Sequence, residues 1–243
     1  MRSCAGGPTM PESKDREHAG AVVRGFSPDA IRERLSALEQ RIRVAGGDPE
    51  KIRILAVSKT FPAAAVSAAR EVGFREFGEN YADELVAKAR AFPDDASLRW
   101  HFIGAIQRNK LARLVPVTAV FEGVTRIEEG RDIARRAPGA RIFVEVDATG
   151  LVNRPGVAIG EAEKLVDELR RFDLDVAGLM TVAAPGPPAS TESIFVRVAG
   201  LARDLGLAEC SMGMSDDLEL AVGAGSTEIR IGTALFGPRG EQR

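Results

Sequence analysis

The sequence has 243 residues, of which 44% are hydrophobic and 28% charged, and its formal net charge is -2. This length suits one sizeable core, and the near balance of charge excludes a nucleic-acid or acidic-lipid partner held by bulk charge. Cys4 and Cys210 are the two cysteines, so no disulfide framework is expected and a reducing compartment fits better. No run of apolar residues approaches the roughly 20 needed to span a bilayer, and the N-terminus lacks the apolar core of a signal peptide. We therefore expect a cytoplasmic protein with no membrane or nucleic-acid partner.

A polar extension precedes the first predicted helix. Residues 1–26 are rich in Gly, Pro, Ser and charged side chains, a composition typical of disorder. Ser27 is then placed to cap a helix that has Pro28 at its first position. Apolar residues recur at helical spacing up to the Gly46-Gly47 pair, at Ile31, Leu35, Leu38 and Ile42.

From residue 52 onward, short apolar runs alternate with amphipathic stretches. Runs that suit buried strands lie at 52–57, 76–78, 100–103, 120–121, 142–146, 176–180, 207–211 and 229–231. Stretches that suit helices lie at 63–72, 81–91, 108–114, 127–136, 161–172, 192–205 and 216–224. Strands that alternate with helices imply a parallel sheet. Eight such strands favour one α/β domain, a (β/α)8 TIM barrel over residues 27–239, with an extra N-terminal helix and a short tail at 240–243.

In such a barrel the active site lies at the carboxyl ends of the strands. The first strand ends at Lys59, and burying an ammonium group is costly unless its charge is paired, neutralised or used. We interpret Lys59 as an amine that holds a carbonyl cofactor, and a lysine that only extends to the rim is the structural alternative. Asn80 follows the second strand and could bind a ligand or cap the next helix.

The last two strands end in segments of small residues. The segment 211–217 joins a strand to a helix with accessible backbone, and Gly232-Thr233 supplies an unobstructed amide and a hydroxyl. Barrel enzymes commonly hold phosphate at these two loops, and a lysine opposite a phosphate site is what pyridoxal 5'-phosphate (PLP) requires. Arg230 shares a strand face with Gly232 and can disfavour protonation of a pyridine nitrogen. Its alternative role is an ion pair with a carboxylate at the rim.

Other polar residues at the strand ends do not favour a metal site. His101 is the one histidine besides His18, and without clustered cysteines a zinc site is not expected. A buried structural role is favoured for His101, and no G-x-S-x-G motif supports a serine hydrolase. Glu145 and Asp147 share a strand face and are interpreted as rim residues rather than metal ligands.

Several motifs together resemble one known family. They are AVSKT at 56–60, FGENY at 77–81, HFIG at 101–104, Q-x-NK at 107–110, GLM at 178–180, SMGMSDD at 211–217 and RIGTALFG at 230–237. This combination is similar to the PLP homeostasis proteins of the YggS/PROSC type, over about residues 28–239. The resemblance implies a PLP-binding barrel of the alanine racemase N-terminal type.

The resemblance also implies how PLP is bound. It implies a Schiff base (a covalent aldimine) on Lys59, Asn80 near the ring face or its 3-hydroxyl, and Arg230 near the ring nitrogen. It implies phosphate contacts from Ser211, from Gly232 and Thr233, and from neighbouring amides such as that of Met212. The implied role is intracellular PLP homeostasis, in which PLP is bound, buffered and delivered to apo PLP-enzymes without robust catalysis.

Two other functions stay open. A small PLP-dependent amino-acid racemase would need a second base opposite Lys59, and alanine racemase presents its tyrosine with help from an extra C-terminal β-domain. This chain stops soon after the barrel and has one tyrosine, Tyr81, so racemase ranks second and a monomer is expected. A phosphate-binding barrel enzyme without PLP ranks third. The chain departs from the family at Arg154, where a lysine is common, and at Cys210, where an aliphatic residue is usual, but neither departure removes a proposed cofactor contact.

Overall fold

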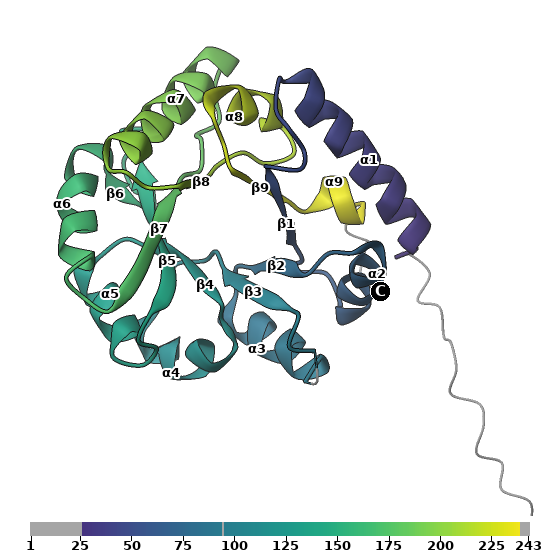
Figure 1. The fold of residues 1–243 in the computed structure, drawn as a ribbon, viewed down its shortest axis with the longest axis horizontal. Coiled ribbons are helices and arrows are strands. Elements are labelled where there is room, and N and C mark those ends of the chain that lie inside the picture. The colour runs from purple at the N-terminus through teal and green to yellow at the C-terminus, as the bar shows by residue number, and fades with distance from the viewer. Residues whose placement is uncertain (1–25, 94, 239–243) are drawn as a thin grey trace, which may run out of the picture.

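Eight parallel strands of the described chain close into a ring (Figure 1). The computed structural model describes residues 26–93 and 95–238, so the predicted disorder of 1–25 and the tail at 240–243 lie outside the described residues. The strands of the ring are β1 (Arg53–Val57), β2 (Glu76–Glu79), β3 (Arg99–Phe102), β4 (Val120–Val124), β5 (Ala140–Asp147), β7 (Leu174–Met180), β8 (Glu209–Ser211) and β9 (Glu228–Ile231). Each pairs with the next, and β9 returns to β1, which confirms the predicted barrel.

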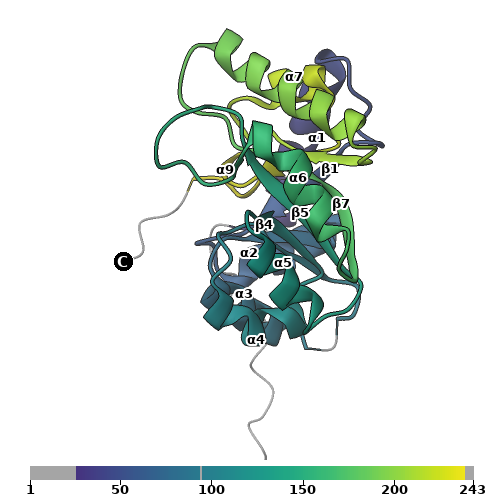
Figure 2. The ribbon, with the colours of Figure 1, turned by 90° about the vertical axis from the view of Figure 1, so that its left-hand side faces the viewer.

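Helices surround the ring on its outer side (Figures 1 and 2). They are α1 (Pro28–Val44), α2 (Ala63–Val72), α3 (Ala82–Ala91), α4 (Leu111–Leu114), α5 (Ile127–Ala134), α6 (Ile159–Leu169), α7 (Pro188–Asp204), α8 (Leu218–Ala224) and α9 (Thr233–Phe236). The helix expected at 108–114 is divided into a 3-10 turn, η1 (Arg108–Lys110), and α4, and a second 3-10 turn, η2 (Val115–Val117), follows. A two-residue strand that the pattern did not predict, β6 (Val157–Ala158), pairs with the end of β5.

The helix expected from residue 192 begins earlier, at Pro188. Proline suits the first helical position. An N–H group there would have no acceptor within the helix, so proline loses no hydrogen bond by lacking one. The loop between β7 and α7 is therefore shorter than the expected bounds of the strand and the helix implied.

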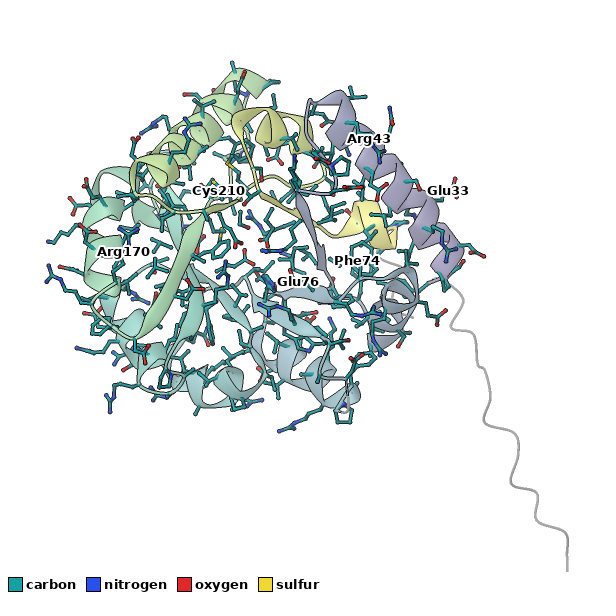
Figure 3. The ribbon with its side chains drawn as sticks, in the orientation of Figure 1. Glu33, Arg43, Phe74, Glu76, Arg170 and Cys210 are labelled. Carbon is teal, nitrogen blue, oxygen red and sulfur yellow. The ribbon has the colours of Figure 1, made fainter. Side chains whose placement is uncertain are left out.

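The predicted N-terminal helix is present as α1. The Ser27 hydroxyl accepts a hydrogen bond from the Ala30 amide at 3.3 Å, which confirms Ser27 as the cap. Ile31, Leu38 and Ile42 are buried on the inner side of α1, which packs against α2, α8 and α9. Figure 3 shows Glu33 and Arg43 on the side of α1 that faces solvent.

The main apolar core lies between the ring and the helices, whereas the inside of the ring combines charged side chains with a smaller apolar cluster of Val120, Phe143, Ala177 and Met180. Along β3, Trp100 and Phe102 belong to the apolar core, and His101 between them faces the interior because side chains alternate along a strand. Glu122 and Glu228 meet His101 there. These charged side chains lie inside the ring, below the carboxyl ends of the strands.

Candidate cofactor site

A cavity of about 530 Å³ lies at the carboxyl ends of the barrel strands. Its volume falls in the range of about 300–1,000 Å³ that is usual for small-molecule sites. Predicted site residues that line it are Lys59, Asn80, Arg230, Gly232 and Thr233. These five positions, at or just after the ends of β1, β2 and β9, therefore surround one space, as expected from the strand order.

Lys59 stands in a turn whose flanking residues are anchored on both sides. Ser58 is fully buried, and its hydroxyl donates to Glu79 Oε1 at 2.6 Å. Thr60 has a φ of 66°, a left-handed conformation that β-branched residues rarely adopt. Its amide donates to Glu84 Oε2 at 2.7 Å. The turn thus presents the partly exposed Lys59 side chain to the cavity.

Arg230 forms a fixed positive charge in the cavity wall. Its side chain is almost fully buried. Nη1 donates to the carbonyl and hydroxyl oxygens of Ser211 at 2.8 and 2.7 Å, and Nη2 donates to the Thr181 carbonyl at 2.7 Å. Because these bonds hold the guanidinium in one place, it can present a positive charge to a ligand without rearranging.

Ser211 and Met212 do not line the cavity. The Ser211 hydroxyl lies 2.8 Å from Glu122 Oε2 and 2.7 Å from Glu228 Oε1 inside the barrel. A hydroxyl has one proton, so one of these contacts requires a protonated carboxyl, and burial raises the pKa of Glu228 to about 7. Met212 is fully buried, and its amide donates to the Glu228 carbonyl at 3.0 Å.

The same loop contributes other residues to the cavity instead. Met214, Ser215 and Asp216 line it, immediately after Gly213, which has a φ of 96°. The sequence pattern selected a loop that lines the cavity, but it did not show which side chains of that loop point into the cavity. Phosphate contacts from Ser211 and Met212 stay a prediction.

His101 lies inside the ring, below the cavity, and its side chain is fully buried. Its Nδ1 is 2.6 Å from Glu122 Oε1. Burial alone would lower the pKa of His101, but the hydrogen bond to Glu122 and the nearby carboxylate of Glu76, 3.6 Å from Nε2, outweigh burial and raise it to about 10. His101 is thus buried and hydrogen-bonded, as expected of a structural histidine.

His101, Glu122 and Glu228 offer ligand atoms within 4.8 Å of one another, a spacing that a metal ion could use. Arg53 Nη1 already pairs with Glu228 Oε2 at 2.9 Å. Because Arg53 and His101 pair with these carboxylates, no metal ion is needed to balance their charge.

Glu145 is a cavity residue that the sequence analysis assigned only to the rim. It lies near the end of β5, lines the cavity and is 6% exposed. Burial raises the pKa of Glu145 to about 7, and the nearby charge of Arg230 opposes that rise. Asp147 instead accepts hydrogen bonds from the Thr149 amide and hydroxyl at 2.9 and 2.6 Å. The pattern placed both carboxylates on one strand face but could not give their depth.

Glycine at position 104 brings two walls of the cavity together. A Cβ atom on Gly104 would overlap the carbonyl oxygen of Asn80. Tyr81, next to Asn80, is half exposed and lines a separate cavity of about 120 Å³. The tyrosine is therefore beside the larger cavity and not among its lining residues.

The sequence and the fold match one class of barrel. Residues 27–240 match the family model described as "Alanine racemase, N-terminal domain". The alanine racemase of Corynebacterium glutamicum shares this fold with a TM-score of 0.69 at 19% identity, over 90% of this chain and 63% of the racemase.

Within that class, a narrower group is much more similar. A "Pyridoxal phosphate homeostasis protein" of Pseudomonas aeruginosa is 38% identical over 221 residues, which cover 86% of this chain and 96% of that protein. The protein of the same name from Escherichia coli is 37% identical over 86% of this chain and 94% of its own. PipY of Synechococcus elongatus, solved with PLP bound, has a TM-score of 0.76 at 31% identity, over 85% of this chain and all of PipY. The chain therefore belongs to the pyridoxal phosphate homeostasis protein family.

Proposed function

We propose that the protein binds PLP in the 530 Å³ cavity and serves PLP homeostasis by holding the cofactor and delivering it to apo PLP-enzymes. The observation that carries the proposal is the donor set of this one cavity. It combines an amine, a fixed guanidinium and small or hydroxyl residues, from Lys59, Arg230, Gly232, Thr233 and Ser215. These groups match the aldehyde, the ring nitrogen and the phosphate of PLP respectively.

Each of these residues would contact a different part of PLP. Lys59 would hold PLP covalently as a Schiff base, because the bound cofactor supplies an aldehyde that a neutral amine can attack. Arg230 would face the ring nitrogen and keep it unprotonated, which weakens the ring as an electron sink. Thr233, Gly232 and Ser215 would surround the phosphate, and Asn80 would contact the ring.

A racemase is the second candidate, and the position of Tyr81 counts against it. Racemisation needs an acid or base on each face of the substrate carbon. Tyr81 is 52% exposed and lines the smaller neighbouring cavity, so it does not stand opposite Lys59. This placement favours holding and release over turnover.

The test starts from the colour of the protein. Protein mixed with PLP should become yellow, and borohydride should fix the cofactor on Lys59, as peptide mass spectrometry would show. Lys59→Ala should lose the fixed adduct, whereas the exposed Lys164 on α6 provides a matched control, Lys164→Ala, that keeps it. Protein that stays colourless would contradict PLP binding and favour a phosphate-binding barrel. Amino-acid racemisation that disappears in Lys59→Ala would place the racemase first.

No helix in the described part of the chain is long and apolar enough to cross a membrane. We propose that the protein acts in the cytoplasm as a monomer. Size-exclusion chromatography with light scattering would test the oligomeric state, and a stable dimer would contradict it.

A further inference from the structure

Lys88 on α3 is a buried lysine outside the cofactor cavity. Its side chain is 8% exposed. Nζ donates to the Ser58 carbonyl at 2.6 Å, to Glu79 Oε1 at 2.6 Å and to Glu84 Oε2 at 3.3 Å. An ammonium group has three N–H donors, so these three acceptors satisfy all of them. Lys88 is thus held in one position.

All three acceptors of Lys88 are tied to the turn that carries Lys59. Ser58, immediately before Lys59, gives its carbonyl to Lys88 and its hydroxyl to Glu79. Thr60, immediately after Lys59, gives its amide to Glu84. The backbone on both sides of Lys59 is therefore bound either to Lys88 or to a carboxylate that pairs with Lys88.

The arrangement is poorly explained as a device for stability alone. Buried ion pairs often add nothing net to stability, because desolvation offsets their attraction. Here Glu79 is fully buried, and its Oε2 has no hydrogen-bond partner among the described residues. Burial raises the pKa of Glu79, and Lys88 and Ser58 oppose that rise. Thr60 adds an unfavourable left-handed conformation. Unfavourable features of this kind persist where they fix a functional geometry.

We infer that Lys88, with Glu79 and Glu84, positions Lys59 for covalent capture of an aldehyde. Lys88 does not line the cavity, so it acts through the turn and is a positioning residue. In the step that it supports, Lys59 Nζ attacks the aldehyde carbon, a carbon–nitrogen double bond replaces the carbon–oxygen double bond, and one water leaves. No electrons are exchanged with another reactant. The inference rests on the proposed function.

Glu84 allows a test that spares the buried core, because its side chain is 33% exposed. Glu84→Ala removes the acceptor of the Thr60 amide, and Glu84→Gln keeps an oxygen there. We expect borohydride-trapped adduct on Lys59 to form at least about tenfold more slowly in Glu84→Ala, since small misplacements of reacting groups cost about 100-fold. Glu84→Gln should retain most of the wild-type rate.

Lys88→Met tests the centre of the arrangement, with exposed Lys164→Met as its matched control. Non-covalent PLP affinity, measured in Lys59→Ala and Lys59→Ala/Lys88→Met, should agree within about twofold, because neither Lys88 nor the three residues that accept its hydrogen bonds line the cavity. A residue of merely structural importance would weaken affinity and trapping together. In cofactor-free protein, the pH dependence of Lys59 acetylation by acetic anhydride should shift in Lys88→Met and Glu84→Ala and stay unchanged in Lys164→Met.

The outcomes separate the two proposals. Folded Glu84→Ala and Lys88→Met variants that trap PLP at the wild-type rate would overturn the positioning role and leave PLP binding intact. Glu84→Gln that is as slow as Glu84→Ala would also overturn it. Wild-type protein that traps no PLP would overturn the proposed function, and the positioning role would fall with it.

Discussion

Glu145 brings a carboxyl group into the cofactor cavity at a depth where ionisation is unfavourable. Its folded-state pKa is about 7, raised from 4.5 by burial. Below about pH 4.5 the carboxyl is protonated in both the folded and the unfolded chain. Between pH 4.5 and 7 the unfolded chain releases a proton that the folded chain keeps, so the free energy of unfolding falls as pH rises. Above pH 7 both states are ionised and the penalty stays constant.

Glu145→Gln should remove this part of the pH dependence. At 1.36 kcal/mol per pKa unit, the variant should gain about 3 kcal/mol over wild type at pH 8 and almost nothing at pH 4.5. Urea unfolding at pH 5, 6, 7 and 8 would measure the difference. The exposed Glu163 on α6 gives a control, Glu163→Gln, that should follow wild type. Equal slopes for Glu145→Gln and wild type would show that Glu145 ionises normally.

Cavity residues could be predicted one by one where their position depends only on strand order. Lys59, Arg230 and Gly232 follow from where a strand ends and which face a residue takes. Ser211 shows the limit, because its hydroxyl turns inward to Glu122 and Glu228. Whether a small residue at a strand end points into the cavity depends on partners more than ten positions away, which no local pattern contains.

At the scale of elements, the loop after β2 and the loop after β3 pack against each other at Gly104 and form part of the cavity wall. A side chain at Gly104 would collide with the Asn80 carbonyl oxygen, which is backbone and cannot move aside cheaply. Gly104→Ala should therefore displace the loop after β2, lower stability by about 1–3 kcal/mol and weaken PLP binding. Thermal unfolding and a PLP titration by absorbance would measure both effects.

Gly160 in α6 provides the control, because nothing lies within 4 Å of the position its Cβ would take. Gly160→Ala should leave PLP binding unchanged and stabilise the protein by up to about 1 kcal/mol, since alanine favours the helix more than glycine. If Gly104→Ala bound PLP as tightly as wild type, the close packing at Asn80 would not matter to the site.

The strands and most helices could be predicted because apolar periodicity reports which face of an element is buried. α2 has the predicted bounds of Ala63–Val72. The single turn α9 was missed, and its residues were interpreted only as a strand end. A helix of four residues is too short to show a period of 3.6.

Across the whole molecule, α1 joins the N-terminal part of the chain to the loops at the end of the barrel. Arg41 Nη2 donates to the Ser215 carbonyl at 2.8 Å, and Arg41 also forms two hydrogen bonds to the Glu219 carboxylate. Arg34 donates to the Leu235 carbonyl at 3.3 Å. The periodicity of α1 predicted a helix with one buried face, but not that its arginines hold the loop in which Ser215 lines the cavity. These contacts link positions more than 170 residues apart.

Arg41→Ala should loosen that loop from a distance. The Arg41–Glu219 pair is partly exposed, so its loss should cost only about 1 kcal/mol of stability. The effect on PLP binding should be larger than the effect on stability. PLP affinity should fall about three- to tenfold, because the Ser215 carbonyl loses its partner and the loop must be ordered again on binding. Arg32→Ala is the matched control, since Arg32 pairs on the same helix with the exposed Asp29. Urea unfolding and a PLP titration would compare the two variants. Equal affinities would mean that α1 covers the barrel without supporting the site, whereas a loss confined to Arg41→Ala would make the N-terminal helix part of the binding machinery.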